Sequence, residues 1–120
     1  MPFISDIASL CNMLFNNNYA MPAFNICSLE MAKAQSWQPA EEAPIIIQTY
    51  PGDLKHASPK VMQAMVKALA EEAAVPTMLH LDHGEGLSMA VSCLRAWVIL
   101  VMFDECGRSL WLKISPKVAA

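Results

Sequence analysis

The run of residues 44–49, PIIIQT, constrains the fold more than any other part of this sequence. It is short, continuous and rich in β-branched residues, which is typical of a strand that is buried on both faces. Strands of this kind belong to parallel sheets, in which a helix connects each strand to the next. The run therefore predicts an α/β protein in which similar strands alternate with helices.

The rest of the chain supplies that alternation. Extended stretches are predicted at residues 20–26, 44–49, 76–81 and 98–103. Helical spacing predicts a short leading helix behind a cap at Ser5, and further helices at residues 28–42, 58–75 and 87–96. The helix at 28–42 is interrupted by QSWQP at 35–39, where an interior proline costs about 3 kcal/mol. The βαβαβαβ order predicts a parallel sheet with right-handed crossovers.

Composition sets the size of the fold and the nature of its surface. The 120 residues are enough for one domain. Hydrophobic residues make up 55% and charged residues 16%, whereas soluble domains average about 25% charged. We therefore expect protein to cover much of the surface. The four cysteines include no CxxC pair and lie in apolar stretches, so buried, reduced thiols are expected.

Charge and hydropathy argue against two classes of partner. The net charge is −3 and the eight Lys and Arg residues are scattered singly, so no basic stripe is present to bind nucleic acid. The longest apolar run, residues 96–103, is far shorter than the roughly 20 residues that span a membrane. The start, MPFISDIASL, has no basic region typical of a secretory signal. A cytoplasmic protein with no membrane partner is expected.

The polar segment at residues 78–86, MLHLDHGEG, is the main candidate for chemistry. Side chains alternate along a strand, so His80 and Asp82 should share a face, with His83 just past the strand end. The carboxyl ends of parallel strands are where α/β proteins assemble their sites. There an imidazole can ligate zinc and a carboxylate can exchange a proton with substrate. The same spacing also fits a capped turn beside a hydrogen-bonded core histidine.

Four segments resemble, in order and spacing, the first half of class II fructose- and tagatose-bisphosphate aldolases over about residues 5–104. They are YAMPAFNICSLEMAKA, EEAPIIIQTYPGDLKHA, MLHLDHGEGLSMAVSCLRA and VMFD. The resemblance implies a TIM (β/α)8 barrel that uses Zn²⁺ in carbohydrate metabolism, as in glycolysis. It implies reversible cleavage of a ketose 1,6-bisphosphate to dihydroxyacetone phosphate and an aldehyde phosphate, by a dimer or tetramer.

The resemblance also implies roles for four residues. Asp82 matches the group that exchanges a proton with substrate, and His83 matches the first zinc ligand. Asp104 matches an alternative metal position, and Asn25 matches a residue near bound substrate.

A whole barrel of this type takes about 250 residues, so the sequence predicts four strands of eight. The expectation is a partial barrel at residues 1–104, truncated after strand four and inactive alone, with a tail of unpredicted structure at 105–120. Three alternatives stay open. One is a non-catalytic half-barrel that pairs with itself or with a full-length aldolase subunit. Another is a decayed gene product. The third is a flavodoxin-like domain, although NICSLE replaces the glycine-rich turn expected after its first strand.

Overall fold

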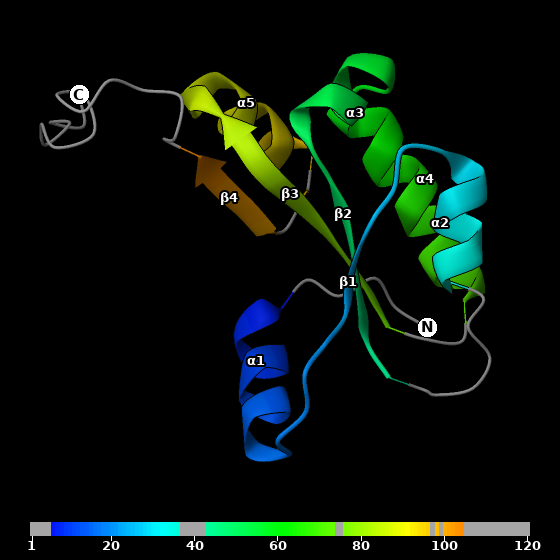
Figure 1. Cartoon of the computed structure of the whole chain (residues 1–120), viewed down its shortest axis with the longest axis vertical. Helices are drawn as coiled ribbons and strands as arrows, with labels where there is room; N and C mark the ends of the chain where they lie inside the picture. The colour runs from blue at the N-terminus through cyan, green and yellow to red at the C-terminus, as the bar shows by residue number, and fades with distance from the viewer. Residues whose placement is uncertain (1–5, 37–42, 74–75, 97, 99, 105–120) are drawn as a thin grey trace, which may run out of the picture.

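The computed structural model describes residues 6–36, 43–73, 76–96, 98 and 100–104, in which strands and helices alternate around one sheet (Figure 1). The strands are β1 (Ala23–Asn25), β2 (Ile45–Thr49), β3 (Thr77–Glu85) and β4 (Leu100–Asp104). The helices are α1 (Ile7–Asn16), α2 (Leu29–Ser36), α3 (Pro51–His56), α4 (Pro59–Glu72) and α5 (Gly86–Arg95).

The strands are all parallel and lie in the order β1-β2-β3-β4. Each strand therefore pairs with the next one along the chain, as in a (β/α)8 barrel. A flavodoxin-like sheet instead places its second strand at the edge and reverses direction beside the first. The sequential order confirms the prediction of half a TIM barrel and shows that the flavodoxin-like alternative is wrong.

The hydrophobic core lies on one face of this sheet. Ile47 of β2 and Leu79 and Leu81 of β3 are fully buried against Val66 of α4 and Cys93 of α5. Helix α2 joins the same core through Ala32 and lies beside α4 (Figure 1). Since α2, α4 and α5 all pack on one face, the connections between strands all turn in the same direction. This arrangement is the one in which a parallel sheet curves into a barrel.

The opposite face of the sheet is less covered than expected. Burial alternates along β2, because Ile45, Ile47 and Thr49 are buried while Ile46 and Gln48 are only half-buried. The prediction that both faces of this strand are buried is therefore wrong for the described residues. The physical reason is that α2 and α4 pack into the core on the face that carries Ile47.

Several helix boundaries differ from the predicted ones for local reasons. Asp6 caps α1, because its carboxylate accepts the N–H of Ser9 at 3.1 Å. Ser58 and Pro59 begin α4 as predicted, and the Ser58 hydroxyl accepts the N–H of Val61. The short helix α3 was not predicted, since its Pro-Gly start is typical of a turn. Of the interruption predicted at 35–39, Gln35 and Ser36 are still helical in α2, and residues 37–39 lie outside the described residues. The predicted cap at Ser5 and the tail at 105–120 also lie outside them.

The cysteines only partly follow the expectation of burial. Cys93 is buried in α5, where burial raises the pKa of its thiol. Cys11 and Cys27 are exposed, so the expectation is wrong for these two, because neither side chain faces the sheet core. Cys106 lies outside the described residues. Among the helices that the structure describes, none is long and apolar enough to cross a membrane.

The burial of Val66 makes a stability prediction. Val66→Ala removes two methyl groups from a fully buried site and should lower the free energy of unfolding by about 2 kcal/mol, measured by urea denaturation. Val61→Ala on the same helix is the matched control, because Val61 is 58% exposed and should change stability by less than about 0.5 kcal/mol. Equal effects of the two substitutions would contradict this packing.

Candidate functional site

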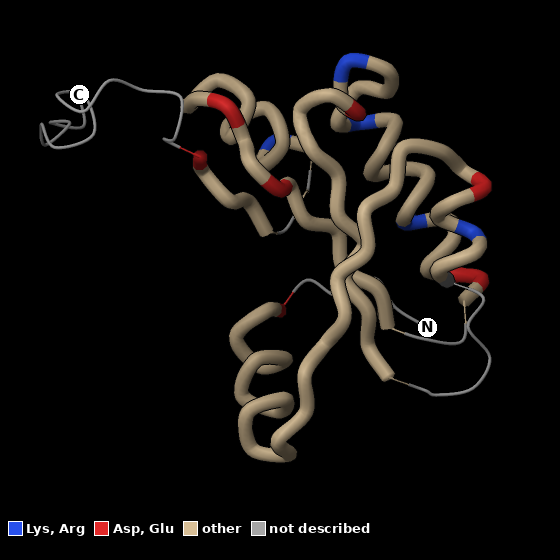
Figure 2. Tube along the Cα trace, in the orientation of Figure 1, with Lys and Arg blue, Asp and Glu red and all other residues tan. Residues whose placement is uncertain are grey.

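The sequence-predicted site residues gather at the carboxyl end of the sheet. Asn25 ends β1 and Asp104 ends β4, while Asp82 and His83 lie in the last part of β3. In Figure 2 acidic residues mark the region where β3 and β4 end. The parallel register aligns these strand ends, so side chains that are distant in sequence meet at one edge of the sheet.

The path of β3 changes within the motif itself. The strand does not end at Leu81 as predicted, because pairing with β4 resumes at Gly84 and Glu85 after a register shift. His83 lies inside this irregularity with a φ of 52°. Left-handed backbone is uncommon for residues other than glycine, although His tolerates it better than β-branched residues do. Strain of this kind often occurs at functional sites.

The imidazole of His83 lies between two carboxylates. Its Nδ1 is 2.9 Å from Oδ2 of Asp104, and its Nε2 is 3.7 Å from Oδ2 of Asp82. The His83 side chain is 59% exposed, whereas those of Asp82 and Asp104 are 21% and 18% exposed. The hydrogen bond to Asp104, and then the charge of Asp82, raise the pKa of His83 above its ordinary 6.5. The geometry therefore joins all three predicted residues of β3 and β4 into one cluster.

A second set of contacts lies on the half-covered face of the sheet. Gln48 of β2 donates from Nε2 to Oδ1 of Asn25 at 2.6 Å and to Oδ2 of Asp82 at 3.4 Å. Nδ1 of His80 lies 3.3 Å from Oε1 of Gln48. Burial is the main cause that lowers the pKa of His80, although the nearby Asp82 opposes it. His80 and Asp82 thus share a face, as predicted, and Asn25 joins them through Gln48.

Gln48 is the site residue that sequence reasoning missed. The run PIIIQT predicts a strand buried on both faces, and this prediction assigns no role to a polar side chain. One signal in the sequence could have identified it. Gln48 is the only strongly polar residue of IIIQT, it lies near the carboxyl end of the strand, and its side chain points to the opposite face from that of Ile47.

The donor set can be tested against a metal ion. An imidazole flanked by carboxylates suits zinc by chemistry, but a catalytic zinc takes three protein ligands. Within the part of the chain that the structure describes, no group of three or more His, Cys, Asp and Glu side chains is arranged to hold an ion. The described residues therefore fit zinc only in part, and the role of His83 as a zinc ligand stays a prediction.

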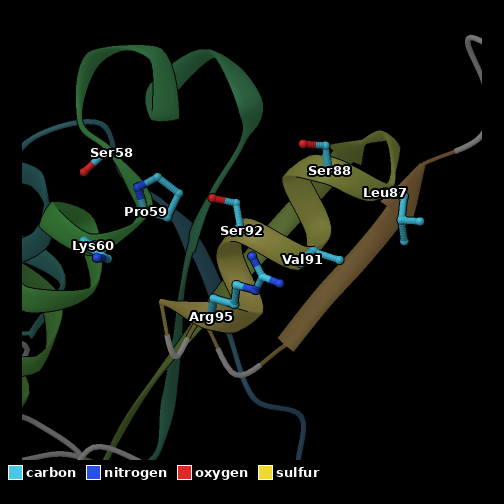
Figure 3. A pocket seen from close by; sticks show the side chains of 8 residues that line it. All are labelled: Ser58, Pro59, Lys60, Leu87, Ser88, Val91, Ser92 and Arg95. Carbon is cyan, nitrogen blue, oxygen red and sulfur yellow. The ribbon is translucent and has the colours of Figure 1, made fainter.

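One cavity among the described residues lies away from this cluster. It measures about 810 Å³ and lies between the start of α4 and the outer surface of α5 (Figure 3). Lys60 and Arg95 line it together with apolar Leu87 and Val91. None of the sequence-predicted site residues lines this cavity, so it is a separate surface feature.

Comparison with known proteins decides the family. The family described as fructose-bisphosphate aldolase class-II matches residues 6–110. The chain belongs to this family. The fructose-bisphosphate aldolase of Treponema pallidum (strain Nichols) is 33% identical to this aldolase-family chain over 92 residues. That match covers 72% of this chain and 28% of the relative, so the chain spans well under half of the curated relative's length.

A solved structure agrees with the fold of the aldolase-family chain. The crystal structure of the YdjI aldolase from Escherichia coli K12 matches with a TM-score of 0.69 and 25% identity. It covers 86% of this chain and 40% of the YdjI chain. The resemblance inferred from the sequence segments is thereby confirmed, and the roles of Asp82, His83, Asp104 and Asn25 stay predictions.

The contact between His83 and Asp104 leads to a prediction about the pKa of His83. Asp104→Asn removes the main cause that raises the pKa of His83, so the imidazole should titrate at lower pH than in the wild type. Proton NMR of His83 in protein treated with a chelator measures this shift. Glu72→Gln, at the end of α4, is a control of the same chemical type and should leave the titration unchanged. An unaltered midpoint in Asp104→Asn would contradict the observed pairing.

Gly84 makes a second prediction about the same cluster. A Cβ at this position would lie 2.9 Å from the backbone oxygen of Met102, so β3 and β4 must move apart to accept it. Gly84→Ala should lower the free energy of unfolding by about 1–3 kcal/mol and reduce the pKa of His83 by weakening its contact with Asp104. Gly86→Ala is the comparison, because no atom from outside its chain neighbours and its own helix backbone lies within 4 Å of the added Cβ. That variant should leave the His83 titration unchanged despite its positive φ.

Proposed function

We propose that this chain contributes Asp82 and His83 to the reversible, zinc-dependent cleavage of a ketose 1,6-bisphosphate into dihydroxyacetone phosphate and an aldehyde phosphate. The observation that carries the proposal is the Asp82–His83–Asp104 cluster, at the carboxyl ends of neighbouring parallel strands in a segment that matches the aldolase family. Sites of barrel enzymes lie at this end of the sheet.

In the proposed role of His83 as a metal ligand, Asp104 orients the ring. The carboxylate of Asp104 accepts a hydrogen bond from Nδ1–H, which leaves Nε2 as the nitrogen with an available lone pair. Histidine ligands commonly use a carboxylate in this way to fix their tautomer and orientation. A bound zinc ion would polarise the carbonyl group of the substrate as a Lewis acid. The remaining ligands would have to come from outside the described residues, either from this polypeptide or from a partner subunit.

Asp82 is proposed to exchange a proton with a hydroxyl group of the substrate. Its side chain is partly exposed, so a ligand at the edge of the sheet can reach it. A general base must lie within hydrogen-bonding distance of the proton that it takes, and a carboxylate held on a strand meets that requirement better than one on a loop. Asn25, also exposed and at the same edge, would bind the sugar-phosphate chain by hydrogen bonding.

Zinc content and cleavage activity of the purified protein test the proposal together. In an assembly that supplies the remaining ligands, the wild type should retain zinc and cleave fructose 1,6-bisphosphate in a coupled assay. His83→Ala should lose both zinc and activity, since the imidazole is proposed as a ligand. Asp82→Asn should retain zinc while turnover falls about 10²- to 10⁴-fold, the range for loss of a proton-transfer group. His56→Ala is the matched control, because His56 is exposed on α3 and should change neither quantity.

A different result would favour the non-catalytic alternative. If the wild type binds no zinc and shows no turnover, light scattering should be used to measure its oligomeric state. A defined homodimer, or a complex with a full-length aldolase subunit, would contradict catalysis by this chain and support an interaction subunit.

A further inference from the structure

Gln48 occupies the centre of the polar face. The parallel register pairs Gln48 with Asn25 on one side and with His80 on the other, so the side chains of these three residues point to the same face. Asp82 lies two residues after His80 and therefore shares that face. The amide of Gln48 contacts all three neighbours, at 2.6 Å to Asn25, 3.3 Å to His80 and 3.4 Å to Asp82.

The chemistry of Asp82 fixes which way this amide points. An ionised carboxylate only accepts hydrogen bonds, so the NH₂ group of Gln48 must face it. The carbonyl oxygen Oε1 then faces His80, and a carbonyl oxygen can only accept, so the ring must donate from Nδ1–H. The remaining N–H of Gln48 points to Asn25, whose Oδ1 accepts it. Both donors and the acceptor of the Gln48 amide are therefore used.

We propose that Gln48 is a positioning residue that holds the Asp82 carboxylate, fixes His80 as the Nδ1–H tautomer and turns the Asn25 amide so that its NH₂ group is left for a ligand. The part of this proposal that concerns turnover rests on the proposed aldolase function, and the hydrogen-bonding part does not. Burial lowers the pKa of His80 and so favours the neutral ring, which is the form that has a tautomer to fix. With Nδ1 protonated, Nε2 of His80 is the ring nitrogen that can accept a proton or a hydrogen bond.

Only an amide satisfies the three neighbours together. A glutamate at position 48 would still accept from His80, but it offers no donor to Asp82 or Asn25 and sets one carboxylate against another. A methionine has similar length and could fill the same space, but it makes none of the three hydrogen bonds. Comparing these two substitutions therefore separates the polar role of Gln48 from its volume.

Nitrogen-15 NMR of the histidine rings tests the hydrogen-bonding part without any need for turnover. At about pH 8, where unperturbed imidazoles are neutral, wild-type His80 should be predominantly the Nδ1–H tautomer. Gln48→Met should shift His80 toward the Nε2–H form that free imidazole prefers. Gln48→Glu should keep Nδ1–H, because its carboxylate still accepts. Gln63→Glu on α4 is a matched control in which the His80 signals should stay as in the wild type.

Kinetics tests the positioning of Asp82 in whichever assembly cleaves sugar bisphosphate. Gln48→Met and Gln48→Glu should lower kcat by about 10- to 100-fold, the range seen when a group that orients a catalytic residue is lost. Zinc content should stay unchanged, which distinguishes this effect from loss of His83.

The outcomes separate this inference from the proposed function. A folded Gln48→Met protein with an unchanged His80 tautomer would overturn the role of Gln48, whether or not the chain is active. The expected tautomer change in a protein without turnover would support the hydrogen-bond assignment and count against the aldolase proposal instead. If Gln48→Met does not fold, Gln48→Glu decides: a kcat equal to that of the wild type would overturn the positioning role.

Discussion

The parallel register of β1, β2 and β3 is the constraint on which the site depends. Parallel pairing places Asn25, Gln48 and His80 side by side at matched positions, so that three polar side chains from separate parts of the sequence share one face. A shift of one residue in any of these strands would turn its side chains to the opposite face. The buried residues Ile47 and Leu79, one position earlier, prevent such a shift because it would move them out of the core.

The two faces of the sheet therefore contribute differently: one packs against helices, and the other carries polar side chains. Helices α2, α4 and α5 cover the apolar face and supply most of the buried contacts, while the other face carries the hydrogen bonds around Gln48. Strands with helices on one face and polar groups at the carboxyl ends on the other form the arrangement that barrel enzymes use for their sites. Stability and chemistry are thus separated within each strand by the alternation of side chains.

Electrostatics links β3 to β4 at the same edge. Asp82 and His83 are neighbours in sequence, whereas the contact between His83 and Asp104 joins two strands at the point where the register of β3 against β4 shifts. The left-handed backbone of His83 and the close approach at Gly84 both lie at this register shift. The local strain and the raised pKa of His83 therefore have one structural origin.

The sequence by itself determined the βα alternation, the parallel sheet, the family and three of the residues in the cluster around His83. It could do so because strand and helix periodicity are local properties, and because the resemblance to the aldolase family is carried by four segments whose order and spacing are visible in the chain. Only the tertiary structure decided the partners: that Asp104 bonds to His83, that Gln48 joins Asn25 to His80 and Asp82, and that one sheet face is left half-covered. These contacts depend on strand register and on the path of β3 after Leu81, which are set by packing between distant segments and leave no local pattern.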